Sequence, residues 1–387
     1  MTFGIRSRFF VAITIIAGMS AVSSMAESRE LTYATGYPAG TPAAIAADIY
    51  ADALNNYSDG RLTAKVFDSG SLLSFKETSM GIRDGMADSG LVFVSYFPAE
   101  YRNVNLVSEL TMLLELTDVS ADKAGAAYVG AMSEYVFHHC PECIDEFASE
   151  NQVYLGGGGS PPYLLLCNQS VKNQADLKGK RLRAPGPQWS RWAESMGATP
   201  VFMSASEVYG GLDQGAIDCS MTVAAELSVW NLSEVVTDIT TDVPGGVYGA
   251  AAANNINAEV WRNLNNEDRR AILHASAELS AHATWIYTTE DREDLAKARN
   301  SDDIQVHEPE KAFVEATQSF IKDDIRTVAD SYREKHGIKR SEEMVASFKP
   351  ILEKWVELVR DVDNGDDLAQ LYWDETFSNV DVNSYGM

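Results

Sequence analysis

Positive charge is scarce in this 387-residue chain, which has 31 Lys and Arg against 56 Asp and Glu and a formal net charge of −25. Surfaces that bind nucleic acid need clusters of Lys and Arg to contact phosphates, so the composition excludes nucleic acid as a partner. The same surplus of acidic groups argues against binding to anionic membranes. It predicts a well-solvated, monomeric protein.

Long apolar runs are also scarce. After residue 26, no uninterrupted apolar run is long enough to span a bilayer. Residues 1–26 are typical of a secretory signal peptide, because Arg6 and Arg8 precede the apolar core 9–17 and small residues lead up to Ala26. We therefore expect cleavage after about Ala26, and an exported protein that does not insert directly into the membrane.

Signatures of enzymes are absent: the chain has no Gly-x-Ser-x-Gly, no His-Glu-x-x-His and no P-loop lysine. The exception is a cluster of four side chains that metals can bind, which comprises His138, His139, Cys140 and Cys143. Adjacent histidines point apart on a helix, and no second half of a metal site follows. We predict no enzyme, no metal and no cofactor, with an exported metal-binding protein or enzyme as the alternative.

Cysteine is rare, with four residues in the chain, and in an exported protein these invite disulfides. Cys140 and Cys143 are near enough in sequence to pair, although a CxxC pair within a helix is geometrically awkward. Cys167 and Cys219 fall on predicted strands, where they are either a bridge or two buried thiols.

Short apolar strands alternate with longer helical segments, which is the pattern of α/β domains. The chain is too long for one core, so we expect two lobes. The first is predicted to comprise residues 27–155 plus about 248–285, and the second residues 156–247 plus about 286–387.

Two segments predict how the lobes are connected. Four glycines at 156–159 lie between two predicted strands and suit a hinge, although a flexible surface loop has the same composition. Residues 266–299 contain no Gly or Pro and would form a helix of roughly 50 Å, long enough to cross both lobes. The tail from Phe377 is polar and is expected to pack loosely.

The most informative motif surrounds Arg183. A short strand over 181–184 is terminated by Pro185-Gly186, which places Arg183 at the strand end. A capping box of Ser204 and Glu207 then begins a helix. An arginine at the end of a strand offers a planar set of donors that fits a carboxylate, whereas a surface arginine beside a turn is the ordinary alternative.

Two segments, 176–186 (which contains Arg183) and 206–218, carry a family resemblance. They resemble the solute-binding proteins of tripartite ATP-independent periplasmic (TRAP) transporters, the DctP-like family. The order and spacing of the elements agree with the family from about residue 30 to 300. The resemblance implies a two-lobed periplasmic-binding-protein fold, with a ligand cleft between the lobes and a long helix crossing both. It also implies hinge closure on a small organic acid and delivery to membrane permease subunits, with a sensory receptor as an alternative partner.

The family also implies site residues. Arg183 matches the arginine that pairs with the ligand's carboxylate. Tyr163 stands where many members have a second arginine, Thr222 where an asparagine is frequent, and Phe75 where an acidic or amide group is common. These departures favour a monoanion, either a carboxylate or a sulfonate, with a less polar body.

Residues near other strand ends complete the predicted site. Tyr37, Tyr96 and Tyr248 are candidate walls of the pocket, although each is also a reasonable core or rim residue. Ser95 lies at the carboxyl edge of the third predicted strand, where α/β sheets place their ligands.

Overall fold

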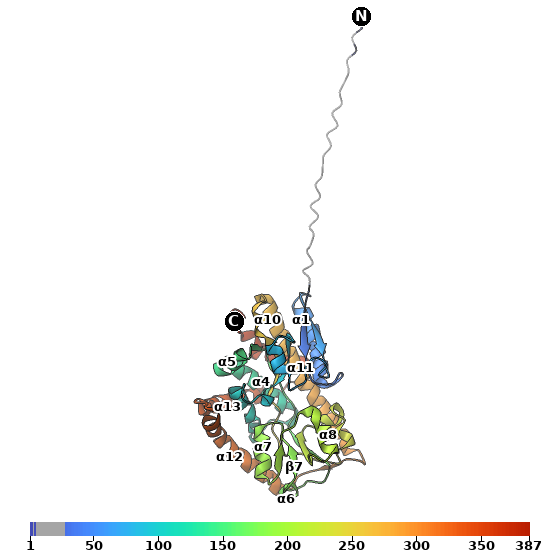
Figure 1. The fold of residues 1–387 in the computed structure, drawn as a ribbon, viewed down its shortest axis with the longest axis vertical. Coiled ribbons are helices and arrows are strands. Elements are labelled where there is room, and N and C mark those ends of the chain that lie inside the picture. Colours follow the sequence, from blue (N-terminus) through green and yellow to red (C-terminus); the bar gives the residue numbers. More distant parts are fainter. Residues whose placement is uncertain (3, 5–27) are drawn as a thin grey trace.

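The computed structural model describes residues 1, 2, 4 and 28–387, so all but a few residues of the predicted signal peptide lie outside the described chain. The described strands form two six-stranded sheets. Elements of the first sheet occupy the upper part of Figure 1 and those of the second the lower part, so the predicted two-lobed α/β fold is confirmed. Among the described helices, none is long and apolar enough to cross a membrane.

The first sheet has the order β2-β1-β3-β11-β4, with β5 also paired to β11. Strand β1 is parallel to both of its neighbours, β2 and β3, and β11 runs antiparallel to β3, β4 and β5. Gly90 in β3 allows close approach to β1, because a Cβ there would lie 2.5 Å from the carbonyl oxygen of Ala34. The strands are β1 (Arg29–Ala34), β2 (Leu62–Phe67), β3 (Ser89–Phe93), β4 (Gln152–Tyr154), β5 (Gly157–Gly158) and β11 (Ala251–Asn257).

The second sheet has the order β12-β10-β6-β9-β7-β8. Strand β7 is parallel to both of its neighbours, and β6 is antiparallel to β9 and β10. The strands are β6 (Leu164–Cys167), β7 (Arg181–Arg183), β8 (Thr199–Val201), β9 (Cys219–Thr222), β10 (Asp238–Thr240) and β12 (Gln305–His307). Because β11 follows β10 in the chain, the first sheet is completed only after most of the second.

Helices cover the sheets and join them. The α-helices are α1 (Pro42–Tyr57), α2 (Thr78–Arg83), α3 (Arg102–Ser108), α4 (Ala121–His138), α5 (Pro141–Ser149), α6 (Gln174–Leu177), α7 (Pro187–Ser195), α8 (Val208–Asp213), α9 (Glu226–Val229), α10 (Ala258–Arg262), α11 (Asn266–Arg299), α12 (Lys311–His336), α13 (Ser341–Leu358) and α14 (Gly365–Glu375). Short 3-10 turns are η1 (Val94–Tyr96), η2 (Glu109–Leu116), η3 (Ala205–Glu207), η4 (Leu232–Glu234) and η5 (Phe377–Asn379).

Helix α11 is the predicted long helix, with the bounds expected from the sequence. Asn265 caps its first turn through a side-chain bond to the amide of Asp268, and Lys297 and Arg299 lie in its last turn, where positive charge stabilises a helix. It contacts β11 of the first sheet and β12 of the second. Figure 1 shows it running alongside both groups of elements.

Two further segments connect the sheets, 159–163 and 241–250. They are joined to each other, since Pro162 and Val247 form an isolated antiparallel bridge and the amide of Tyr163 donates to the carbonyl of Gly246 at 2.8 Å. In the first segment, a Cβ on Gly159 would lie 2.6 Å from Val129, so this glycine allows close packing. The hinge role of the glycine run and the limits of the two lobes stay predictions.

Both disulfides that the sequence left open are formed. Cys167 and Cys219 face each other on the antiparallel strands β6 and β9 and are bonded. Cys140 is bonded to Cys143. The geometric difficulty of a CxxC pair within a helix does not arise, because Cys140 caps α5 from outside the helix.

The prediction for the C-terminal tail is wrong. Phe377, Val380 and Val382 are buried, and the hydroxyl of Tyr385 donates to the carbonyl of Tyr154 at 2.7 Å. Apolar residues spaced among polar ones pack the tail onto the first lobe, and the average polarity of the segment concealed this pattern.

Candidate ligand-binding site

A small cavity of about 70 Å³ lies between the two sheets. Its walls come from the carboxyl ends of strands in both sheets, from the segments that cross between them, and from α11. Six aromatic side chains line it: Tyr37, Phe93, Tyr96, Tyr163, Tyr248 and Tyr287. A mostly apolar cavity with a few polar groups is typical of a small-molecule site.

Arg183 is the positive charge of this cavity. It is the last residue of β7 and is 3% exposed. Its Nε donates to the carbonyl of Met203 at 3.1 Å and its Nη1 to that of Met221 at 3.3 Å, which fixes the plane of the guanidinium. Within the described part of the chain, Arg183 has no carboxylate bonded to it. A buried guanidinium without a bonded anion is electrostatically suited to take one from a ligand.

Tyr163 and Tyr248 form one wall with Trp189. The rings of Tyr163 and Trp189 stack with centroids 4.4 Å apart and planes 19° apart, and the Trp189 and Tyr248 planes are within 7°. Trp189 is held by its Nε1, which donates to the carbonyl of Gly245 at 3.0 Å. Burial raises the pKa of both tyrosines well above 10, so both phenols are neutral donors at neutral pH.

Tyr96 and Ser95 lie where the two sheets meet. The phenol oxygen of Tyr96 accepts a hydrogen bond from the amide of Ala205 at 3.1 Å, so it joins η1 to η3. Ser95 and Tyr248 share a hydrogen bond of 2.6 Å between their hydroxyls. Tyr96 lines the cavity, whereas Ser95 lies behind Tyr248 and does not.

Thr222 and Tyr37 both line the cavity: Thr222 is the last residue of β9, and Tyr37 lies in the turn that follows β1. Phe75 does not: it is buried edge-on against Tyr37, with ring centroids 5.1 Å apart. The structure thus brings six of the eight predicted residues to one cavity. Contact of any of them with a ligand stays a prediction.

Glu226 is a cavity residue that the sequence analysis missed. It begins α9, four residues after Thr222, and is 6% exposed. The hydroxyl of Tyr287 on α11 donates to its Oε1. Burial raises the pKa of Glu226 to about 7, while the bond from Tyr287 and the charge of Arg183 oppose the rise. No motif marks this residue, because its side chain reaches the cavity only through the turn after β9.

The cluster around Cys140 is not arranged to bind a metal through thiolates, because both of its sulfurs are in the disulfide. The Nε2 of His138 is 3.1 Å from the carbonyl oxygen of Thr376, and His139 lies 3.9 Å from Glu134. His138 therefore has a partner near the C-terminus, whereas His139 faces a carboxylate of its own helix α4.

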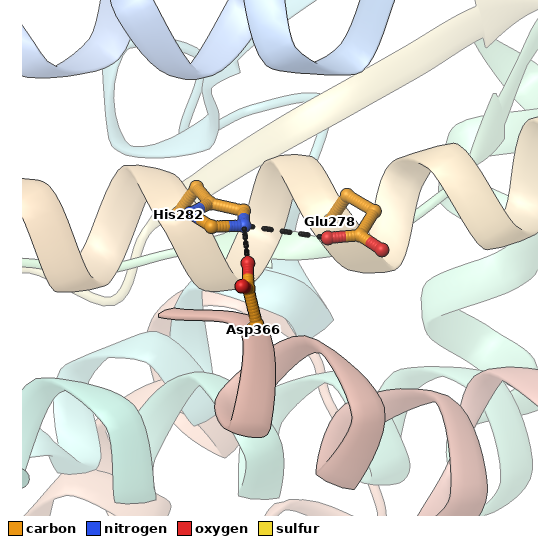
Figure 2. Close-up of side chains that lie close together, drawn as sticks. All are labelled: Glu278, His282 and Asp366. Atoms are coloured by element: carbon orange, nitrogen blue, oxygen red, sulfur yellow. Dashed lines mark ion pairs between the residues drawn. The ribbon is translucent and has the colours of Figure 1, made fainter. Parts of the chain in front are cut away.

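A different group has the composition of a metal site. Glu278 and His282 on α11 and Asp366 on α14 each offer one ligand atom, all within 4.8 Å of one another (Figure 2). Their contacts with each other explain the arrangement: His282 Nε2 is 3.3 Å from Glu278 and 3.2 Å from Asp366. We interpret the group as an ion-pair network that ties α14 to α11, and none of its three residues lines the cavity.

Comparison with protein families gives a match to the bacterial extracellular solute-binding proteins, family 7, over residues 33–331. A solute-binding protein of Roseobacter denitrificans is 25% identical over 279 residues, which is 70% of this chain and 81% of the relative.

Solved structures show the same fold. One is a marine metagenome TRAP solute-binding protein specific for aromatic acids, in complex with 3-hydroxybenzoate, with a TM-score of 0.73 at 18% identity. It is matched over 85% of this chain and 99% of its own. A TRAP protein of Bordetella bronchiseptica with bound mandelate has a TM-score of 0.69 at 21% identity, and is matched over 84% of this chain and 99% of its own.

A third structure is a marine metagenome TRAP protein in complex with pyroglutamate, with a TM-score of 0.69 at 18% identity. It is matched over 84% of this chain and 99% of its own.

Proposed function

Because the chain belongs to family 7 of the bacterial extracellular solute-binding proteins, which serve TRAP transporters, we propose that it captures a small organic acid for import. The observation that carries this proposal is Arg183, a guanidinium buried in an aromatic cavity with its plane fixed by two carbonyls. The family comprises binding proteins for transport, so no catalytic step is needed.

The ligand carries one strong anionic group, a carboxylate or a sulfonate. Arg183 is the one basic side chain among the described residues that line the cavity, and Tyr163 and Thr222 are uncharged. A second carboxylate would have no cation to meet it and would lie near Glu226. The similar structures with 3-hydroxybenzoate, mandelate and pyroglutamate, which are all monocarboxylates, support this ligand class.

Binding closes the two lobes on the ligand, and the closed protein delivers it to membrane permease subunits in the periplasm. Tyr96 supports closure, because its bond to Ala205 joins elements beside the two different sheets. A ligand that touches both lobes stabilises the closed state by its higher affinity for that state.

A thermal-shift screen tests the proposal, because a ligand that binds only the folded protein stabilises it by about 2.7 kcal/mol at a hundred times its dissociation constant. The screen compares monocarboxylates, matched sulfonates, C4-dicarboxylates and divalent metals. We expect monoanions to give the largest shifts. If dicarboxylates outrank every monoanion, the single-anion assignment is wrong. Stabilisation by a metal and by no acid would favour the alternative of an exported metal-binding protein.

A further inference from the structure

The cavity contains a buried carboxylate as well as a buried guanidinium. Glu226 and Arg183 both line it and both are more than nine-tenths buried. They are not bonded to each other in the described structure: Arg183 donates to backbone carbonyls, and Glu226 accepts from Tyr287. The cavity therefore separates two charged groups of opposite sign, and neither is paired with a charge.

An acid with no second polar group would fit this arrangement poorly. Its anionic group would meet Arg183, and the rest of the ligand would cover Glu226 without offering it a partner. A buried carboxylate that loses access to water without gaining a hydrogen bond is strongly unfavourable. A ligand with an N–H or O–H group directed at Glu226 removes this penalty.

We propose that Glu226 determines specificity by accepting a hydrogen bond from an N–H or O–H donor that the ligand carries in addition to its acid group. The proposal rests on the function proposed above. Glu226 is the one carboxylate among the described residues that line the cavity. An ionised carboxylate only accepts, whereas the tyrosine and threonine hydroxyls there adapt to either role, so ionised Glu226 is the lining side chain that imposes a donor on the ligand.

The second oxygen of Glu226 is the free one. Tyr287 occupies Oε1 and orients the carboxylate. The other charged group near the carboxylate is Asp291 on α11, which is bonded to the amide of Ala225 at 3.1 Å and repels the ionised form of Glu226. Because Tyr287 donates to Oε1 and Asp291 offers no donor, Oε2 is the oxygen of Glu226 that can accept a hydrogen bond from the ligand.

Matched acids test the proposal by titration calorimetry at pH 8, where Glu226 is ionised. Mandelate, phenylglycine and phenylacetate share one skeleton and carry a hydroxyl, an ammonium and no donor. Lactate, alanine and propionate repeat the comparison on a smaller skeleton. In each series, we expect the tighter-binding of the two donor-bearing acids to bind about 10- to 100-fold more tightly than the donor-free acid. The hydroxyl and ammonium members then identify which donor the site takes.

The variant is Glu226→Gln, which keeps the size of the side chain and an oxygen for Tyr287. We expect its preference for the donor-bearing acid to fall to within about threefold, because the remaining acceptor is neutral. Glu234→Gln is the matched control, since Glu234 is exposed and accepts from Tyr209 at 2.8 Å outside the cavity. Its preference should equal that of the wild type.

The outcomes separate this proposal from the function. Equal affinity of wild type for the members of each series, or an unchanged preference in a folded Glu226→Gln protein, overturns the role of Glu226 and leaves acid binding intact. If neither series binds and no other organic acid stabilises the protein, the proposed function fails and this proposal fails with it.

Discussion

Lys76 and Glu207 form an ion pair of 2.8 Å that spans the boundary between the two lobes. Lys76 precedes α2, which lies beside the first sheet, and Glu207 completes the capping box with Ser204 beside the second. Both side chains are about half exposed. The contact lies at the outer edge of the same boundary that Tyr96 and Ala205 close nearer to the cavity.

Lys76→Ala should weaken affinity for the best acid of the screen by at most about fivefold, because an exposed ion pair contributes little. The loss should shrink in high salt, which screens exposed charges. Calorimetry at low and high salt measures both effects. Lys311→Ala is the control, since Lys311 is 3.4 Å from Glu315 within α12. A larger loss that salt does not alter would point to a direct role of Lys76 in binding.

Arg183→Ala should weaken binding of the best acid of the thermal-shift screen by about 30-fold to several thousand-fold, because the variant leaves the anion buried without a partner. Arg183→Lys should restore affinity only in part, since an ammonium lacks the planar fork. Arg181→Ala is the matched control on the same strand, where Arg181 is partly exposed and bonded to Asp218 at 3.0 Å. Affinity of a folded Arg183→Ala protein within threefold of wild type would exclude the assignment.

The titration of Glu226 should make the ligand-free protein less stable as the pH rises. Its pKa is about 7 in the folded protein and 4.5 ordinarily, so the folded state holds the proton more tightly between these values. Stability from this group is therefore lost as pH rises from about 4.5 to 7.

Glu226→Gln removes that titration. Between pH 5 and pH 8, the free energy of unfolding of wild type should therefore fall by on the order of 2–3 kcal/mol more than that of the variant. Urea unfolding at the two pH values measures this difference. Glu234→Gln is the control, because Glu234 is exposed and does not line the cavity, and an equal effect of both variants would contradict the assignment of the shift to Glu226.

Loss of the disulfide between β6 and β9 should destabilise the protein more than loss of the other. Cys167 and Cys219 are 52 residues apart, and closing that loop is worth about 4 kcal/mol, whereas the three-residue separation of Cys140 and Cys143 is worth about 2. All four sulfurs are buried, so paired Cys→Ala variants remove similar packing. Urea unfolding should give the Cys167/Cys219 variant a lower free energy of unfolding than the Cys140/Cys143 variant. The reverse order would contradict the loop-length argument.

Local signals in the sequence predicted much of the fold and the position of Arg183 in the candidate site. The absence of Gly and Pro located α11, and the strand ended by Pro185-Gly186 placed Arg183 at the sheet edge. The Ser204–Glu207 capping box is confirmed as well. Each of these depends on neighbours within a few residues, which is why the sequence alone was sufficient.

What the sequence did not predict depends on contacts between distant segments. Glu226 reaches the cavity because α9 packs against α11, where Tyr287 binds it. Phe75 was expected at the ligand, but it packs behind Tyr37, which takes the position next to the cavity. Neither outcome can be read from residue type or spacing, because both depend on packing between segments that are far apart in the sequence.

The place of β11 in the first sheet affects how the chain is made. Synthesis proceeds from the N-terminus, yet β3 receives its antiparallel partner only when residues 251–257 have emerged, after most of the second sheet. Until then β3 has an open edge that other chains can pair with. A protein cut after β10 would keep that edge permanently, so the first lobe is not a separable module, although most of its residues come first in the chain.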